Sequence, residues 1–324
     1  MADTAGTADE RRLLAVTRTQ GDNEALKTGE VKPQGWSFAF EEVPVLVHAF
    51  RRMVRGLAFD VSEMALTTYL VAKEHGARFT AVPAFLVRGF HHGAIHYNPA
   101  RWPSVKSPKD LEGHKVGVSR GYTVTTGVWA RAVLQEEYGV DLSTITWVLS
   151  GDEHVASYEP PSNVESMPEG ATLEQLLADG ELAACIGAGA DVPGVVPLVP
   201  DAEEAGFAAL QTRGFYPINH LVVVKDELLR ERPELGAEVF DAFARAKRLY
   251  VDRLRAGAIE NPTATDRMYA RVLETTGEDP LPYGIAPNRA VLETLMRHAV
   301  DQRILRRPAA LEDVFAKTTL DVTG

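Results

Sequence analysis

The sequence predicts a two-lobed α/β fold in which each lobe is a mainly parallel sheet flanked by helices. The chain has 324 residues, 45% of them hydrophobic, which is enough for a sizeable core and, at roughly 100 to 200 residues per domain, for two lobes. Short apolar runs alternate with amphipathic segments, which is typical of parallel sheets covered by helices. Extended crossings near 97–103 and 208–216 enclose a middle block. We therefore expect lobe 1 to comprise 1–98 and 215–324, lobe 2 to comprise 99–214, and a ligand to bind in the cleft between them.

The N-terminal part of lobe 1 shows the alternation clearly. Short apolar or alternating runs at 13–16, 36–40 and 59–64 predict strands, and the second follows a Lys-Pro-Gln-Gly turn. Between them, apolar residues recur at helical spacing through 43–57, and a further helix is expected around 67–74.

The rest of the chain continues the pattern, with a surface loop or mobile flap expected at 159–170, which is rich in proline, serine and glutamate. Beyond residue 227 the chain looks helical, with breaks at prolines. The remaining predicted strands are 81–86, 94–97, 116–118, 145–149, 184–186 and 221–224. Further helices are predicted at 126–138 and 173–178, and amphipathic helices at 238–256 and 289–300.

Composition excludes several classes of protein. The net charge of −11 and the absence of a dense Lys/Arg run argue against a nucleic-acid binder. The single cysteine, Cys185, excludes an internal disulfide, and its apolar neighbours favour a buried small hydrophobe over a nucleophile. No apolar run has the length of a membrane span, and 1–12 is polar and acidic, unlike a secretory signal. The expected location is the cytoplasm.

Two neighbouring stretches carry most of the chemistry. Arg88-Gly-Phe-His-His-Gly-Ala-Ile-His96 places basic side chains close together, and Leu111-Glu-Gly-His-Lys-Val-Gly-Val-Ser-Arg120 leads through a threonine-rich turn into a helix. Imidazole exchanges protons near neutral pH, and free amides at a helix start favour an anion. The pattern indicates chemistry directed at a small acid.

Several short motifs occur in order from about residue 13 to the C-terminus. They are Phe59-Asp-Val-Ser-Glu-Met64, Phe90-His-His92, Asp110-Leu-Glu-Gly-His-Lys-Val-Gly-Val118, Gly127-Val-Trp129, Asp179-Gly-Glu181, Tyr216-Pro-Ile218 with His220, and Tyr283-Gly-Ile-Ala-Pro-Asn-Arg289. Each alone is weak, but their ordered sum resembles the 4,5-dihydroxyphthalate decarboxylase family. The resemblance implies a type II periplasmic-binding-protein-like fold, used inside the cell as a cofactor-independent lyase that removes one carboxyl group from a dihydroxybenzoate.

The sequence departs from the family pattern at two places on the expected cleft edge. Relatives carry Pro-Glu-Tyr-Gln-Met-Thr where this chain has Ser119-Arg-Gly-Tyr-Thr-Val-Thr125, and Ala-Arg-Ala-Pro where it has Ala188-Gly-Ala-Asp191. We therefore expect the reaction type to be kept and the substrate to differ.

The resemblance assigns the catalytic work to three residues. His92 would protonate the ring carbon that loses CO₂, because an electron-rich arene needs a proton there. Glu63 would accept the proton of a ring hydroxyl or fix a histidine tautomer. His220 is a second acid–base group or, equally well, a residue that packs at the hinge.

The substrate carboxylate would be held by local donors, since the whole chain is acidic. Arg88 and Arg120 compete for the role of carboxylate clamp, and His91 stands where relatives have a basic residue. The helix-start group would use free amides and hydroxyls, although the same residues also act as ordinary helix caps. The full binding set is Arg88, His91, Ser119, Arg120, Thr123, Thr125, Thr126, Asn288 and Arg289; for the last two, capping and surface roles remain the alternative.

No cofactor is expected. A divalent metal held by His91, His92, Glu63 and His220 is a minor alternative, because adjacent histidines in a strand point to opposite faces. The partner is a small aromatic carboxylate, neither nucleic acid nor membrane is expected, and a homo-oligomer is left open.

The leading hypothesis is a decarboxylase of a benzoate-like or phthalate-like hydroxylated acid, acting in aromatic-compound catabolism. The rivals are a non-catalytic solute-binding or sensory module for a small carboxylate, and a dehydratase on the same fold. Loss of CO₂, loss of water and binding without turnover separate the three.

Overall fold

The structure, a computed structural model, describes residues 11–324. Residues 1–10, on which part of the expectation about a secretory signal rests, lie outside the described residues. Between residues 11 and 324, none of the helices combines the length and apolarity that crossing a bilayer demands.

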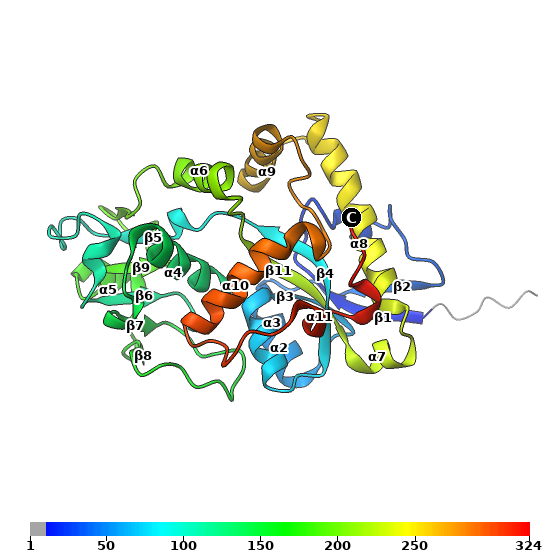
Figure 1. The fold of residues 1–324 in the computed structure, drawn as a ribbon, viewed down its shortest axis with the longest axis horizontal. Coiled ribbons are helices and arrows are strands. Elements are labelled where there is room, and N and C mark those ends of the chain that lie inside the picture. The colour runs from blue at the N-terminus through cyan, green and yellow to red at the C-terminus, as the bar shows by residue number, and fades with distance from the viewer. Residues whose placement is uncertain (1–10) are drawn as a thin grey trace, which may run out of the picture.

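The chain forms two sheets side by side, each with its own helices (Figure 1). The first sheet has the strand order β2-β1-β3-β11-β4. Its strands are β1 (Arg11–Val16), β2 (Trp36–Phe40), β3 (Val61–Ala65), β4 (Phe79–Arg88) and β11 (Ile218–Lys225). The second sheet has the order β10-β5-β9-β6-β7-β8. Its strands are β5 (Ile95–Tyr97), β6 (Lys115–Val118), β7 (Thr146–Leu149), β8 (Val164–Ser166), β9 (Ala184–Ile186) and β10 (Val196–Pro197).

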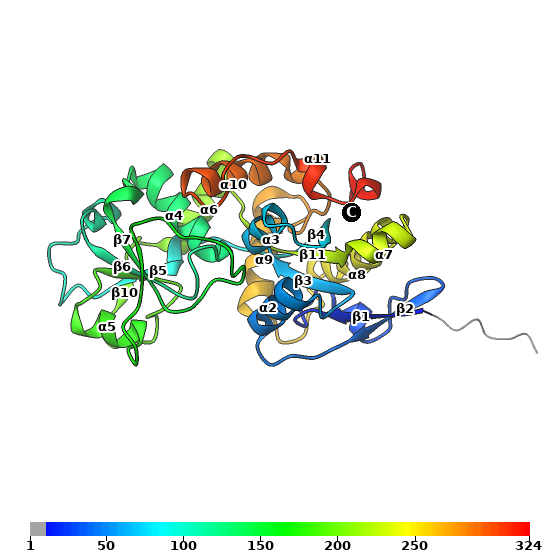
Figure 2. The same ribbon diagram turned by 90° about the horizontal axis from the view of Figure 1, so that it is seen from below.

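Helices pack around both sheets, and the two lobes lie at opposite ends of the molecule (Figure 2). With the first sheet are α1 (Glu24–Lys27), α2 (Leu46–Gly56), α3 (Leu66–Glu74), α7 (Asp226–Glu231), α8 (Leu235–Arg255), α9 (Ala264–Thr276), α10 (Arg289–Asp301) and α11 (Leu311–Val314). With the second are α4 (Thr125–Tyr138), α5 (Leu173–Asp179) and α6 (Ala202–Arg213). Figure 1 shows α10 reaching across from the first lobe towards the second.

The predicted two-lobed α/β architecture is confirmed, but both sheets are mixed. β1, β2 and β3 run parallel, as do β6, β7, β8 and β9. β11 is antiparallel to β3 and β4, and β5 is antiparallel to β9. β5 and β11 are the first strands that the chain forms after it crosses from one lobe to the other.

The crossings differ from the predicted ones in position. β5 pairs within the second sheet, so the first crossing lies between β4 and β5, before the predicted boundary at residues 98 and 99. The second crossing is not extended through 208–216, because α6 continues to Arg213 and ends at Gly214, whose left-handed backbone (φ 63°) closes the helix. The predicted loop at 159–170 contains β8, which adds an edge strand next to β7.

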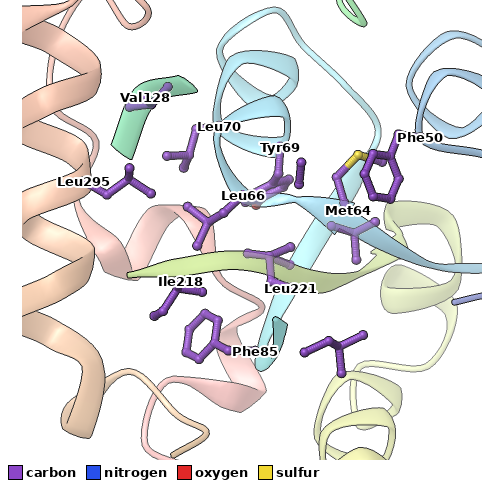
Figure 3. Packing of buried hydrophobic residues seen from close by; sticks show 14 of the residues in the cluster. Phe50, Met64, Leu66, Tyr69, Leu70, Phe85, Val128, Ile218, Leu221 and Leu295 are labelled. Atoms are coloured by element: carbon purple, nitrogen blue, oxygen red, sulfur yellow. The ribbon is translucent and has the colours of Figure 1, made fainter. Parts of the chain in front are cut away.

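The main hydrophobic cluster takes residues from both lobes, and a smaller one lies within the second lobe around α5. α3 is buried from Leu66 to Ala72, including the hydroxyls of Thr67 and Thr68, which are hydrogen-bonded, as expected of a helix between two layers. Figure 3 shows Leu66 and Leu70 of α3 near Leu221 of β11, with Val128 of α4 and Leu295 of α10 beside them. Because this cluster takes residues from both lobes, the junction between them is packed.

Candidate active site

The centre of the candidate site is a buried carboxylate–imidazole pair on adjacent strands. Glu63 of β3 lies opposite Val222 of β11, and His220 is two residues before Val222, so both side chains are on the same face of the sheet. His220 Nδ1 lies 2.6 Å from Glu63 Oε1, and the other carboxylate oxygen accepts the Arg18 backbone N–H at 2.8 Å. Two of the three residues predicted to be catalytic are therefore in direct contact.

The pair orients the imidazole. An ionised carboxylate only accepts hydrogen bonds, so Nδ1 of His220 is the donor and Nε2 is left for proton exchange. The Glu63 side chain is fully buried, whereas His220 keeps 20% of its side chain exposed. Phe50 packs edge-on against the imidazole with 5.3 Å between ring centroids. His220 is thus fixed in orientation and still open to a ligand or solvent.

Asn219, which precedes His220 on β11, contacts a second group of polar residues. Its Nδ2 lies 3.1 Å from His91 Nε2 and 3.4 Å from Thr126 Oγ1, in the first turn of α4. Burial, and then the neighbouring His92, lowers the pKa of His91 to about 3. His91 is therefore neutral near pH 7. The part predicted for His91 in binding the substrate carboxylate stays a prediction, and a neutral imidazole would play it through uncharged hydrogen bonds only.

The starts of α3 and α4 meet at the junction of the lobes. The Thr67 backbone N–H donates to Thr125 Oγ1 at 3.1 Å, and Thr67 Oγ1 donates to the Thr123 carbonyl at 2.5 Å. Helix starts carry unpaired amides and a partial positive charge. Two such ends therefore lie beside His220 and Asn219 in an otherwise acidic protein.

Part of the predicted carboxylate site is filled by the protein itself. The carboxylate of Glu153, in the loop after β7, accepts the backbone N–H groups of Tyr122 and Thr123 and the Thr123 hydroxyl, the last at 2.5 Å. Burial raises the pKa of Glu153 against the opposing effect of these bonds. Thr123 and Thr125 therefore join segments of the protein. The amides of the first turn of α4, those of Thr125, Thr126 and Gly127, donate to no acceptor within residues 11–324.

His92, predicted as the proton donor, lies elsewhere. Its side chain is fully buried, and its Nε2 lies 3.0 Å from both carboxylate oxygens of Glu137, which also pairs with Arg213. Glu137 is in the last turn of α4, about 18 Å along the helix from its start at 1.5 Å per residue. The turn after β4 thus directs the adjacent histidines to different neighbours, and the structure places His92 on Glu137 and not on the Glu63–His220 pair; its role as proton donor stays a prediction.

Arg88 is also buried and engaged in structure. One of its terminal nitrogens donates to the Tyr216 carbonyl at 3.2 Å and to Asn288 Oδ1 at 2.9 Å, and the guanidinium lies over the Tyr216 ring at 4.5 Å. Asn288 uses its amide to bind the carbonyls of Pro282 and Gly284. Arg289 is exposed and pairs with acidic side chains of the surface. Arg88 and Asn288 thus brace the crossing at Tyr216, and none of the three residues has a hydrogen bond to Glu63 or His220 among residues 11–324.

Ser119 and Arg120 follow the carboxyl end of β6. The Ser119 N–H donates to the Ile186 carbonyl at 2.9 Å, and Arg120 has a left-handed backbone (φ 70°) whose N–H donates to Ser150 Oγ at 2.8 Å. The Arg120 side chain is exposed and makes no hydrogen bond to the part of the chain that the structure describes. It is the predicted arginine that remains free to reach a ligand.

Four residues around the Glu63–His220 pair were not predicted: Arg18, whose backbone binds Glu63; Asp22, a buried electrostatic neighbour of Glu63; Glu153; and Asn219. Arg18 and Asp22 follow the carboxyl end of β1, where ligands of parallel sheets bind, and that rule could have identified them. Asn219 immediately precedes the predicted His220. No sequence signal marks Glu153, because its amide partners come from another loop.

The metal alternative finds no support in the geometry. Within residues 11–324, no group of three or more His, Cys, Asp and Glu side chains is arranged to hold an ion. The donors proposed for it are divided, since His92 pairs with Glu137 while Glu63 pairs with His220.

Comparison with known proteins gives two curated relatives. The chain is 30% identical over 295 residues to 4,5-dihydroxyphthalate decarboxylase from Comamonas testosteroni, covering 84% of this chain and 86% of the relative. It is 37% identical over 146 residues to 4,5-dihydroxyphthalate decarboxylase from Pseudomonas putida, covering 43% of this chain and 55% of that one. No protein-family model matches the chain.

Solved structures share the fold at low identity. The periplasmic sulfonate-binding protein SsuA from Methylobacillus flagellatus KT gives a TM-score of 0.52 at 12% identity, covering 95% of this chain and 92% of that one. The desulfurization enzyme DSZB gives 0.52 at 14% identity, covering 96% and 98%. The fold is thus that of periplasmic binding proteins, and by its 30% identity across most of its length to a curated member the chain belongs to the 4,5-dihydroxyphthalate decarboxylase family of carboxy-lyases.

Proposed function

We propose that this protein removes a carboxyl group, as CO₂, from a hydroxylated aromatic acid, with His220 as the proton donor. The observation that carries the proposal is the Glu63–His220 pair, with 2.6 Å between Nδ1 and Oε1, in a member of a decarboxylase family. The pair lies next to the start of α4 through Asn219 and Thr126. An acid–base group and an anion-favouring helix end are what the reaction needs.

The substrate carboxylate would lie against the first turn of α4. The free amides there and the Thr126 hydroxyl offer hydrogen bonds, and the helix end adds a favourable field. Asn219 directs its Nδ2 hydrogens at His91 and at the Thr126 hydroxyl and so fixes that hydroxyl in place, and exposed Arg120, in the same lobe as α4, can add charge. No donor in this group except Arg120 carries a full charge, so the carboxylate can lose its charge in the reaction at modest cost.

The chemical step would consist of one proton transfer followed by the loss of CO₂. Nε2 of protonated His220 gives a proton to the ring carbon that bears the carboxylate, and a C–H bond forms. A ring hydroxyl supplies electron density that stabilises this intermediate. The C–C bond to the carboxylate then breaks, its electron pair restores the aromatic ring, and CO₂ leaves. Glu63 holds the imidazole in place, and solvent returns the proton to His220.

The direct test is to incubate the purified protein with 4,5-dihydroxyphthalate and with monocarboxylic catechol acids, and to measure CO₂ release. The panel includes both because the sequence departs from relatives at 119–125 and 188–191. We expect CO₂ release from at least one compound, and a rate at least about 100-fold lower in His220→Gln. If no member of the panel yields CO₂, or if His220→Gln is as active as the wild type, the proposal fails.

The expected cytoplasmic location and any homo-oligomer remain predictions. Cell fractionation tests the location, and light scattering measures the oligomeric state.

A further inference from the structure

A polar pocket of about 570 Å³ lies between the loop after β1 and the turn that joins α8 to α9. Its lining includes Arg18, Gln20 and Asp22 from the loop, and Tyr250 and Tyr269 from the helices. Arg18 connects the pocket to the candidate active site, because its backbone N–H binds the Glu63 oxygen that does not face His220. The pocket is therefore one hydrogen bond away from Glu63, although neither Glu63 nor His220 is among its lining residues.

Two buried polar groups of the pocket lack partners. Asp22 is only 2% exposed, and its Oδ2 accepts the Tyr283 hydroxyl at 3.1 Å, whereas its Oδ1 has no partner within residues 11–324. Gln20 accepts a hydrogen bond from Arg18 with its Oε1 at 3.1 Å, whereas its buried Nε2 donates to nothing in that range. Such groups are rare in native proteins and call for a ligand or water.

Asp22 is a neutral acid near pH 7. Burial, and then the charge of Glu63, raises its pKa to about 8, against the Tyr283 hydrogen bond and the charge of Arg18. The other titratable groups that face it are Lys247 and Tyr250 of α8 and Tyr269 of α9. A protonated carboxyl both donates and accepts hydrogen bonds.

We propose that this pocket binds the ring hydroxyls of the substrate, with the Gln20 amide donating to one oxygen and the Asp22 carboxyl bonded to its neighbour. The inference rests on the proposed function, which supplies an aromatic ring with hydroxyls next to His220. Phenolic hydroxyls are neutral and each can donate and accept, which matches an amide and a neutral carboxyl. The pocket would then favour catechol acids over unhydroxylated benzoates.

Binding to the full chain tests the pocket without turnover. Isothermal titration measures the dissociation constants of catechol and of benzoate for the wild type and for Gln20→Leu. We expect Gln20→Leu to weaken catechol about 5- to 10-fold, the value of one hydrogen bond, and to leave benzoate unchanged. The matched control is Glu24→Gln, an exposed change in the same lining that should leave both constants unchanged.

The pH dependence supplies the second readout, which a merely structural role would not alter. Wild-type affinity for catechol should fall above about pH 8, as Asp22 ionises. Asp22→Asn, which keeps a donor and an acceptor but does not ionise, should lose that fall. Wild-type protein that does not bind catechol, equal catechol affinity in Gln20→Leu, or an unchanged pH profile in Asp22→Asn would each overturn the inference. Catechol binding that depends on Gln20, in a protein that releases no CO₂, would overturn the proposed reaction and leave the pocket standing.

Discussion

His92 and His220 each contact a carboxylate, yet their surroundings give them different roles. His92 is fully buried, and its partner Glu137 is also bound by Arg213. His220 keeps 20% of its side chain exposed, and its partner Glu63 is anchored by the Arg18 backbone. A fully buried histidine held by an ion-paired carboxylate contributes to stability, even though its Nδ1 has no partner within residues 11–324, whereas a partly exposed histidine can exchange a proton with a ligand or solvent.

Substituting the two histidines should therefore have opposite effects. His220→Gln should lower kcat about 10²- to 10⁴-fold, the usual contribution of a general acid, with substrate affinity changed only a few-fold. His92→Gln should lower the melting temperature and leave kcat of the folded protein within a few-fold of the wild type. Steady-state CO₂ release and thermal melts check this, and a larger kcat loss in His92→Gln than in His220→Gln would contradict it.

Asp22 should make stability depend on pH. Its pKa is about 8 in the folded state and near 3.8 when unfolded, so the folded protein holds the proton more tightly. The contribution is fully present below about pH 4 and is lost as pH rises towards 8. At about 1.4 kcal/mol per pKa unit, the wild type should lose up to about 4 kcal/mol of unfolding free energy between pH 5 and 8 relative to Asp22→Asn. Urea unfolding at both values measures the difference, and parallel pH profiles would exclude this role.

At the scale of elements, α2 of the first lobe binds the loop that follows β7 of the second lobe. Arg51 and Arg55 of α2 pair with Asp152 at 2.5 and 3.0 Å, and Arg55 also donates to the carbonyls of Glu153 and His154. Exposed ion pairs contribute only about 0 to 1 kcal/mol each. Their shared effect here is to keep the Glu153 carboxylate on the amides before α4.

Loosening that loop should weaken substrate binding. We expect Arg55→Gln to raise KM several-fold with little change in kcat, because the residue lies outside the Glu63–His220 pair and acts on the start of α4. Arg52→Gln is the matched control, since Arg52 lies on the same helix but pairs with Glu41. Kinetics at low and high salt measure both variants, and identical KM values for the two would rule out the role of Arg55.

The elements themselves could largely be predicted from sequence. β2 has the predicted bounds, and α4 begins one residue before its predicted start, because apolar periodicity is a local property. α6 was missed as a helix in the crossing region, and the edge strand β8 was missed in a segment without apolar alternation. An edge strand is made by pairing with β7, which no local pattern encodes.

At the scale of the whole molecule, α10 joins the lobes. Arg297 and His298 of α10 contact Glu136 of α4 at 2.6 and 3.0 Å. Gln302, just after α10, donates to the Val128 carbonyl at 3.0 Å and accepts from buried Arg131 at 2.8 Å. Together with the shared apolar cluster, these contacts couple the two sheets.

The protein should therefore unfold as one cooperative unit. Differential scanning calorimetry is expected to show a single transition whose calorimetric and van't Hoff enthalpies agree. Gln302→Leu, which removes a contact between the lobes, should lower the transition temperature without splitting the peak. Two resolved transitions in the wild type would mean that the lobes are independent.

By itself the sequence determined the two-lobed α/β architecture, the family, the buried character of Cys185 and the candidacy of Glu63 and His220. Periodicity and short motifs depend on residues that are close in the sequence, and composition depends on the residue types alone, so all three can be known without the tertiary structure. Only the tertiary structure decided that His220 and not His92 contacts Glu63, that Glu153 occupies amides predicted for a ligand, and that Asn219 reaches the first turn of α4. Each of these depends on which distant strands and loops meet, and on the burial that results, which residue order along the chain does not specify.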